Sequence, residues 1–565
     1  MSRATCEVSE RGSQCGSKCG PNGPFAAVVN AVRPGFYLDS VALMRISAQI
    51  SSLPGVAEAV LMIGTPANKS IVHEAGLLLP SSQSCGANDL LIAIGGDDTQ
   101  RVELALAEAE AALDGDRVRR DDSAETLATD LAEALARQPQ TNLLLVSTPG
   151  EYAAEEARAA LNAGCNVMIF SDNVSLEAER ALKQQGHEQG LLVMGPDCGT
   201  AIIAGVPLAF CNIVPDGAIG VIAASGTGLQ EFSVLVSRLG GGIHHGIGVG
   251  GRDLSDTVGA LSTLAAIDLL EADPAIDVIV LISKPPGERA ARHVFTRLAG
   301  CSKPVIACVL GFDVAAHSDL PLQLDEHDDA QRDAPGAGAP PALLAGRVRV
   351  VATLERAAML ATGNGALCAD PAWSADGRQR LARELASELR GLPGGMARQR
   401  LCGLFTGGTL CTEARLVLEG MGLELSGLEQ DRSVPVAVQR GHCLVDLGDD
   451  RFTVGRPHPM IEPATRVPHL QAALSEPTVA VVLIDLVLGL GAHGDPASAV
   501  VSALSAARAA GMPVPIVVGS VCGTDADPQG RARQQALLES AGVVVAPCNA
   551  EAARLAGLLV GELAC

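Results

Sequence analysis

Two turns rich in glycine and hydroxyl residues each follow an apolar run and precede a helix-like run. The first turn is Ser225-Gly226-Thr227-Gly228, and the second is Thr406-Gly407-Gly408-Thr409. The backbone N–H groups at a helix N-terminus can bind an anion, and the helix dipole adds about half a positive charge there. Glycine lets the backbone approach such an anion closely. The pair predicts two helix ends that bind one phosphate, although such turns also serve as ordinary helix caps.

The composition favours a large α/β protein. The chain has 565 residues, of which 48% are hydrophobic and 2% aromatic, and this length is enough for about three or four domains. Small apolar side chains are typical of parallel sheets covered by helices. The net charge of −23 argues against nucleic acid or a membrane surface as a partner.

The sequence shows no evident signal peptide and no run that we expect to span a membrane. The first thirty residues are polar, and the most apolar run, 479–490, is short and is interrupted by Asp485. We therefore expect a cytoplasmic protein whose cysteines are mostly reduced. Cys6, Cys15 and Cys19 lack an apparent fourth ligand, so a disordered tail is favoured over a metal site there, and no metal site is predicted.

Alternating apolar runs and amphipathic runs predict doubly wound parallel sheets. Polar stretches at 117–123 and 317–342 are expected to be loops. The last two blocks share an order of strand, hydroxyl turn and helix, which we interpret as an internal duplication. The predicted divisions are a disordered tail (1–25), a small α/β unit (26–89), three larger α/β blocks (90–215, 216–361 and 399–565) and a linker (362–398).

Several motifs resemble the α subunit of succinyl-CoA synthetase. They are Gly195-Pro196-Asp197-Cys198, the run from Gly220 to Thr227 and the glycine-rich run from Gly246 to Gly251. The third block resembles the ligase domain of that enzyme's β subunit. The chain resembles in particular the FdrA group of succinyl-CoA-synthetase-like proteins, which fuses the two halves.

This resemblance implies the domain types. Residues 90–215 would form a Rossmann-like domain of the CoA-binding type, and two flavodoxin-like ligase-type domains would follow. In the synthetases, two opposed helix N-termini hold the transferred phosphate, and the matching residues here are 225–228 and 406–409.

Other parts of the synthetase pattern are missing. The family's phosphorylated histidine lies in a Gly-His-Ala-Gly loop, whereas His317 here has no glycine neighbours, and Lys284 stands where the family has an orienting acid. The glycine-rich coenzyme A loop and an ATP-grasp domain are not recognisable. We expect phosphate as a substrate, and we expect no certain cofactor. Binding of coenzyme A or a nucleotide stays open.

The FdrA resemblance implies a subunit of an oxamate carbamoyltransferase of anaerobic allantoin and purine catabolism. In that reaction, oxalurate and phosphate give oxamate and carbamoyl phosphate. The implied partners are YlbE-like and YlbF-like subunits in an oligomer that binds a small-molecule substrate. Two other classes stay open, namely an acyl-CoA synthetase of the succinyl-CoA type and a non-catalytic, anion-binding scaffold.

For the carbamoyl transfer, Lys284 would stabilise the developing oxyanion. His245, or its neighbour His244, would protonate the leaving nitrogen. Arg252 would hold the substrate carboxylate. Each has a plainer interpretation, respectively a solvated loop lysine, packing histidines and a local ion pair with Asp253.

A second group of residues is expected to line the same cleft. Asp197 and Cys198 share a loop there, although the Cys198 thiol itself is expected to be structural. Arg456 lies in a polar group around prolines with His458 and Glu462, and it is the fourth predicted substrate-binding residue, after Arg252, Asp197 and Cys198.

Overall fold

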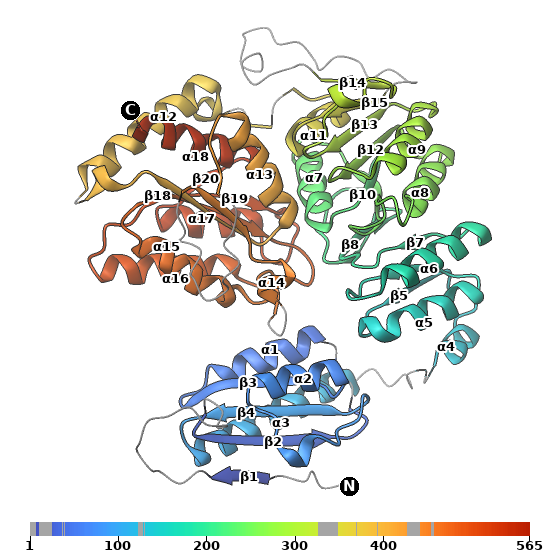
Figure 1. Cartoon of the computed structure of the whole chain (residues 1–565), viewed down its shortest axis with the longest axis vertical. Coiled ribbons are helices and arrows are strands. Elements are labelled where there is room, and N and C mark those ends of the chain that lie inside the picture. Colours follow the sequence, from blue (N-terminus) through green and yellow to red (C-terminus); the bar gives the residue numbers. More distant parts are fainter. Residues whose placement is uncertain are drawn as a thin grey trace. The chain divides into compact units, whose positions relative to one another are not determined.

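The computed structural model describes residues 7–10, 25–36, 38, 40–121, 128, 130–325, 348–365, 367–368, 370–392, 394–426, 441–453 and 457–564. They belong to two compact units (Figure 1). The first comprises residues 1–128 with 453–457, and the second comprises residues 129–452 with 458–565. Arg456 and the cysteines Cys6, Cys15 and Cys19 lie outside the described residues.

The first unit is built on an antiparallel sheet in the order β1-β2-β4-β3. Helices α1 and α3 pack on one face of this sheet, and residues from α2 pack on the other face. The elements are β1 (Glu7–Glu10), β2 (Ala27–Arg33), α1 (Ser40–Ser51), β3 (Val56–Ile63), α2 (Pro66–Glu74), β4 (Leu90–Gly96) and α3 (Thr99–Asp121).

Three expectations for this unit are corrected by the structure. The boundary expected after residue 89 cuts the sheet, because β4 pairs with β2 and β3. The loop expected at 117–123 is helical up to Asp121, since its Arg and Val residues do not break a helix. Residues 7–10 of the expected disordered tail pair with β2.

The second unit begins with a small parallel sheet in the order β5-β6-β7. The next hairpin, β8 and β9, pairs with β11 of the following sheet, so the block expected over 90–215 is divided between three sheets. The elements are α4 (Leu131–Arg137), β5 (Leu143–Val146), α5 (Gly150–Asn162), β6 (Asn166–Ile169), α6 (Leu176–Gln189), β7 (Val193–Met194), β8 (Thr200–Ile203) and β9 (Val206–Ala209).

The two remaining sheets have the same strand order. The eight-stranded sheet runs β14-β15-β13-β12-β10-β11-β8-β9, and the five-stranded sheet runs β17-β16-β18-β19-β20. Counted from β10 without the hairpin β8–β9 and the edge strand β14, and counted from β16 in the other sheet, the strands follow the flavodoxin-like order 2-1-3-4-5. The expectation of an α/β fold with parallel sheets is confirmed, and the shared order is what an internal duplication would produce.

The strands of the eight-stranded sheet alternate with helices that cover its faces. One face carries α7 and α11, and the other carries α8 and α9. Part of the expected 317–342 loop is the strand β14, and residues 326–342 lie outside the described residues. The elements are β10 (Ile219–Ala223), α7 (Gly226–Arg238), β11 (Ile243–Gly248), α8 (Leu261–Ala272), β12 (Val278–Ser283), α9 (Glu288–Ala299), β13 (Val305–Val309), β14 (Leu322–Leu324), β15 (Val348–Val351) and α11 (Leu354–Thr362).

The five-stranded sheet shares its apolar core with the eight-stranded one. Side chains from α7, α11, α12, α13 and α18 form one continuous cluster. The expected linker, 362–398, therefore contains a packed helix, α12, which lies against α18. The elements are α12 (Ala375–Gly391), β16 (Arg400–Phe405), α13 (Gly408–Gly420), β17 (Cys443–Asp446), α14 (Asp450–Thr453), α15 (Val467–Ser475), β18 (Val479–Val487), α16 (Pro496–Ala509), β19 (Ile516–Cys522), α17 (Arg531–Ser540), β20 (Val544–Ala546) and α18 (Asn549–Ala564).

None of the helices in the described part of the chain has the length and apolar character needed to cross a membrane.

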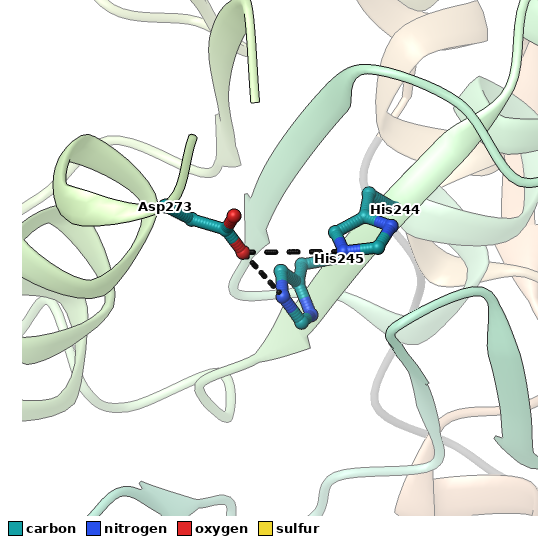
Figure 2. Close-up of side chains that lie close together, drawn as sticks. All are labelled: His244, His245 and Asp273. Atoms are coloured by element: carbon teal, nitrogen blue, oxygen red, sulfur yellow. Dashed lines mark hydrogen bonds and ion pairs between the residues drawn. The ribbon is translucent and has the colours of Figure 1, made fainter. Parts of the chain in front are cut away.

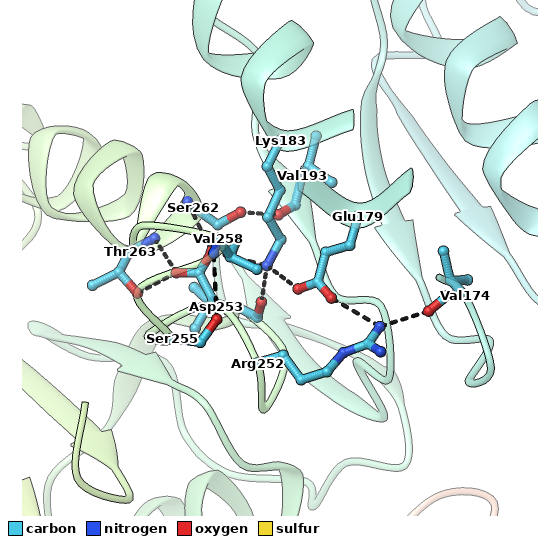
Figure 3. A network of polar contacts seen from close by, with 11 residues as sticks. Val174, Glu179, Lys183, Val193, Arg252, Asp253, Ser255, Val258, Ser262 and Thr263 are labelled. Carbon is cyan, nitrogen blue, oxygen red and sulfur yellow. Dashed lines mark hydrogen bonds and ion pairs between the residues drawn. The ribbon is translucent and has the colours of Figure 1, made fainter. Parts of the chain in front are cut away.

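A buried charge network fastens α6 to the loop after β11 (Figure 3). The Lys183 ammonium binds Glu179 at 2.9 Å and Asp253 at 2.8 Å, and all three side chains are at most 1% exposed. Glu179 also binds Arg252 at 2.8 Å. The Asp253 carboxylate accepts further hydrogen bonds from the start of α8. Because every charge has a partner, the network can stay ionised in the interior.

Replacing Lys183 by alanine is expected to lower the stability of the second unit by about 3–5 kcal/mol, because two buried carboxylates lose their shared cation. The matched control is Arg292→Ala, which removes a pair with Asp319 whose side chains are 50% and 52% exposed. That change should leave the transition temperature nearly unchanged, because an exposed ion pair contributes little to stability. Calorimetric unfolding compares the variants, and equal transition temperatures would contradict a structural role for the network.

Candidate functional site

Both hydroxyl-rich turns lie at the topological switch points of their sheets. Strand β10 lies between β11 and β12, and β16 lies between β17 and β18. The turn 225–228 follows β10 directly, and the turn 406–409 follows β16 directly. In open α/β sheets, ligands bind outside the carboxyl ends of the strands at such points.

The first turns of α7 and α13 touch each other. The hydroxyl groups of Ser225 and Thr409 share a short hydrogen bond. A Cβ added at Gly228 would lie 3.1 Å from the Thr409 methyl carbon, and one added at Gly407 would lie 3.1 Å from Thr227. The sequence therefore supplies glycine where the two helix ends approach most closely.

A buried asparagine at the start of α18 ties the two helices together. The Asn549 backbone N–H donates to Glu231 of α7 at 3.2 Å, and its side-chain amide donates to Glu413 of α13 at 2.8 Å. Both acids are buried. Burial raises the pKa of Glu413 to about 7. These contacts fix the spacing of α7 and α13 behind their N-termini.

The helix ends present amide donors. The Ser225 hydroxyl accepts from the Gly228 N–H at 3.1 Å, as an N-cap does. Within the described part of the chain, the N–H groups of Gly226, Thr227, Gly408 and Thr409 have no hydrogen-bond acceptor. These amides are able to bind the oxygens of an anion.

Asp485 already occupies part of the predicted anion site. Its carboxylate accepts from the Thr406 N–H at 2.7 Å, the Thr406 hydroxyl at 2.9 Å and the Gly407 N–H at 2.9 Å. The predicted phosphate contacts at Thr406 and Gly407 are therefore used internally. Asp485 is fully buried and is paired with Arg466 at 2.6 Å. An acid in the most apolar run of the chain was the sequence signal for this role.

A second acid, Asp446, lies beside α13 at the end of β17. A Cβ at Gly408 would come within 2.5 Å of the Asp446 carboxylate oxygen, so a larger residue there would displace the Asp446 side chain. Burial, together with the negative charges of the nearby Asp485 and Asp449, raises the pKa of Asp446 from 3.8 to about 6. The opposing influences on this pKa are a hydrogen bond from the Gly448 N–H and the positive charge of Lys284.

Lys284 comes from the other sheet, where it follows β12. It is exposed, and its charge acts on Asp446 and Cys411 of the five-stranded sheet domain. The structure thus brings together Ser225, Thr409, Asp446 and Lys284 around two helix N-termini. A cation, free amides and an acid that titrates near neutral pH suit phosphoryl or acyl chemistry.

His245 lies near the amino ends of the parallel strands of the eight-stranded sheet, not near their carboxyl ends. It pairs with Gly220 at the start of β10, whereas the turn 225–228 follows the end of that strand. The expected role of His245 or His244 in protonating a leaving group at the anion site is therefore wrong on geometry. His317 stacks on Phe312, with ring centroids 4.5 Å apart, and is half-buried.

The predicted substrate-binding residues are engaged elsewhere or lie outside the description. Arg252 binds Glu179 and the Val174 carbonyl oxygen, each at 2.8 Å. Cys198 is buried, and burial raises the pKa of its thiol to about 12. Asp197 is exposed on the same loop. Arg456 is not described, although its neighbour His458 packs against Gly448.

Two family models match the chain. The model described as CoA-ligase matches residues 404–559, and the model described as AllF, heavy metal-associated domain, matches residues 26–129. The cysteine of this second segment, Cys85, is buried against the carbonyl oxygens of Gly86 and Asp89. Among the described residues of that segment, no three ligating side chains cluster, so they do not fit a metal centre.

Curated relatives cover different shares of the chain. It is 38% identical over 541 residues to the uncharacterized protein YahF of Escherichia coli (strain K12), covering 94% of this chain and 98% of YahF. It is 26% identical over 185 residues to the succinate–CoA ligase [ADP-forming] subunit alpha of Methanothermobacter thermautotrophicus, covering 32% of this chain and 60% of that one. It is 29% identical over 181 residues to the malate–CoA ligase subunit alpha of Methylorubrum extorquens, and this match covers 30% of this chain and 58% of that subunit.

These matches change the functional expectation. The predicted carbamoyltransferase class is contradicted, because the CoA-ligase model and the two ligase subunits indicate a ligase. The chain spans about three fifths of the length of those ligase subunits. The match to YahF, in contrast, covers nearly all of both chains. This protein therefore belongs to the family of YahF, among the succinyl-CoA-synthetase-like proteins.

Proposed function

We propose that this protein is an acyl-CoA ligase of the succinyl-CoA synthetase type, in which α7 and α13 hold the transferred phosphoryl group. The observation that carries the proposal is the contact between two switch-point helix N-termini through Ser225 and Thr409. The relatives named succinate–CoA and malate–CoA ligase suggest a small carboxylic acid as the substrate. Three finer statements stay predictions. They are the grouping of this protein with the FdrA proteins, a role in allantoin breakdown, and YlbE-like or YlbF-like partners.

The chemistry of such a ligase needs charge stabilisation at one place. A carboxylate oxygen attacks the γ-phosphorus of ATP to give an acyl phosphate and ADP, and the coenzyme A thiol then displaces phosphate from the acyl carbon. Negative charge lies on the phosphoryl oxygens in both steps, so fixed donors and a cation lower both barriers. The amides of Gly226, Thr227, Gly408 and Thr409 are the donors in this proposal, and Lys284 is the cation.

Asp446 is the proposed proton-transfer group. Its carboxyl lies against Gly408 at the start of α13, next to the phosphoryl position. With a pKa of about 6, it can exchange a proton at neutral pH. In this role it protonates the phosphate that leaves when the thioester forms.

The first experiment measures thioester formation from succinate or malate with coenzyme A and ATP by the full chain. Ser225→Ala and Thr409→Val should each lower the rate about 10- to 100-fold, because the helix ends lose the hydroxyls that align their donors. Ser233→Ala on α7 and Thr412→Val on α13 remove hydroxyls that bond within their own helices, and they should leave the rate unchanged.

A parallel phosphorus NMR titration follows binding of inorganic phosphate to the same variants. Thioester formation that is equal in the site and control variants would overturn the proposed location. Phosphate binding at the site without thioester formation from any acid tested would favour the anion-binding scaffold over the ligase.

Asp446→Asn is expected to change how stability depends on pH. The folded pKa of Asp446 lies above its ordinary 3.8, so the acid binds its proton more tightly in the folded state. Its stabilising contribution is therefore complete below about pH 4 and is lost as pH rises through 6. Relative to the parent, Asp446→Asn should gain up to about 3 kcal/mol between pH 4 and pH 7.

Urea denaturation across this pH range measures the effect. Asp277→Asn, an exposed acid that is not among the groups acting on Asp446, is the control and should follow the parent. A constant difference between Asp446→Asn and the parent at every pH would contradict the raised pKa.

A further inference from the structure

A cluster of two histidines and an aspartate lies at the amino edge of the eight-stranded sheet, away from the anion turns. One nitrogen from each of His244 and His245 and an oxygen of Asp273 all lie within 4.8 Å of one another. Figure 2 shows both imidazole rings beside one Asp273 carboxylate. The Nε2 atoms of His245 and His244 are 3.1 Å and 3.9 Å from the same carboxylate oxygen.

A register shift explains why two consecutive histidines face one carboxylate. Side chains of successive strand residues normally point to opposite faces. Here Ile219 pairs with Ile243, and Gly220 pairs with His245, so His244 has no partner on β10. An extra residue of this kind is a bulge, and bulges redirect side chains. Asp273 follows the last residue of α8 and completes the group.

From this geometry, we propose that His244, His245 and Asp273 form a binding site for a divalent transition metal such as Zn²⁺ or Co²⁺. Imidazole nitrogen and carboxylate oxygen are the ligands such ions accept, with bonds of about 2.0–2.2 Å. Ligand atoms around one such ion lie about 3–3.5 Å apart, so rotation of the His244 side chain is enough to close the site.

The surroundings of His244 favour a cation. Its Nδ1 lies 2.8 Å from the Asp216 carboxylate, which leaves Nε2 free of its proton and able to ligate, as in carboxylate–histidine–metal triads. The site also lies at the C-terminal end of α8, where the helix dipole is negative. The ammonium of Lys303 binds the Asp273 backbone carbonyl oxygen, and its positive charge acts against the binding of a metal cation.

Metal binding requires His245 to change its tautomer. In the structure, its Nδ1 accepts from the Ala204 N–H at 3.1 Å, so the ring proton is on Nε2 and faces Asp273. On metal binding this single ring proton moves from Nε2 to Nδ1, and the ion takes the lone pair that is freed on Nε2. Ala204 is exposed, so water can accept its N–H.

The test is a titration of the full chain with Co²⁺, followed by its visible absorption. One equivalent should bind, with weak bands of a nitrogen and oxygen ligand set. His244→Ala and Asp273→Asn should weaken binding about 100-fold, and Asp216→Asn about 10- to 100-fold, because it orients a ligand. Since Asp216 is exposed, this last variant also serves if the others do not fold. His187→Ala on the exposed face of α6 is the control and should bind as the parent does.

Two results would overturn the proposal. One is equal affinity of all variants for Co²⁺. The other is an intense thiolate charge-transfer band, which would place the ion on cysteines, among them Cys6, Cys15 and Cys19. Because the readout is metal binding, ligase activity of the same variants stands as an independent result.

Discussion

Two helix N-termini, each with a positive dipole end, are held against each other in this protein. That arrangement is electrostatically unfavourable by itself. The apolar cluster shared by α7, α11, α12, α13 and α18 imposes it, because separating the helices would expose this core to water. The buried hydrogen bonds from Asn549 to Glu231 and Glu413 set the spacing. A region of positive potential is therefore built into the interface of the two sheets.

The protein neutralises only part of this potential. Asp485 bonds to the amides at Thr406 and Gly407, and Arg466 in turn balances Asp485. The amides one residue further along α13 and those at the start of α7 are left for an external anion. Asp446 stands at the border of the two regions, where burial and neighbouring acids keep its proton on at mildly acidic pH. The proposed anion binding and proton transfer would thus depend on one connected set of charges around the start of α13.

The eight-stranded sheet has different chemistry at its two edges. Its carboxyl edge carries Ser225 and Lys284, as parallel sheets place ligand sites. Its amino edge carries His244 and His245, which stand beside each other because of a local register shift. The histidines were expected to serve the anion site since they precede a glycine-rich run. The length of the strand between the edges separates them from it.

The sequence by itself determined the parallel α/β architecture and the position of the two glycine-hydroxyl turns, because apolar periodicity and glycine-hydroxyl turns are local signals. Ser225 to Gly228 and Thr406 to Thr409 were placed correctly at helix starts for that reason. Tertiary structure decided which donors remain available. Asp485 lies 76 or more positions beyond those turns in the chain, and only strand pairing brings it to them. The partners of Arg252 and Asp446 likewise depend on packing between distant segments, as does the joining of β4 to the first sheet.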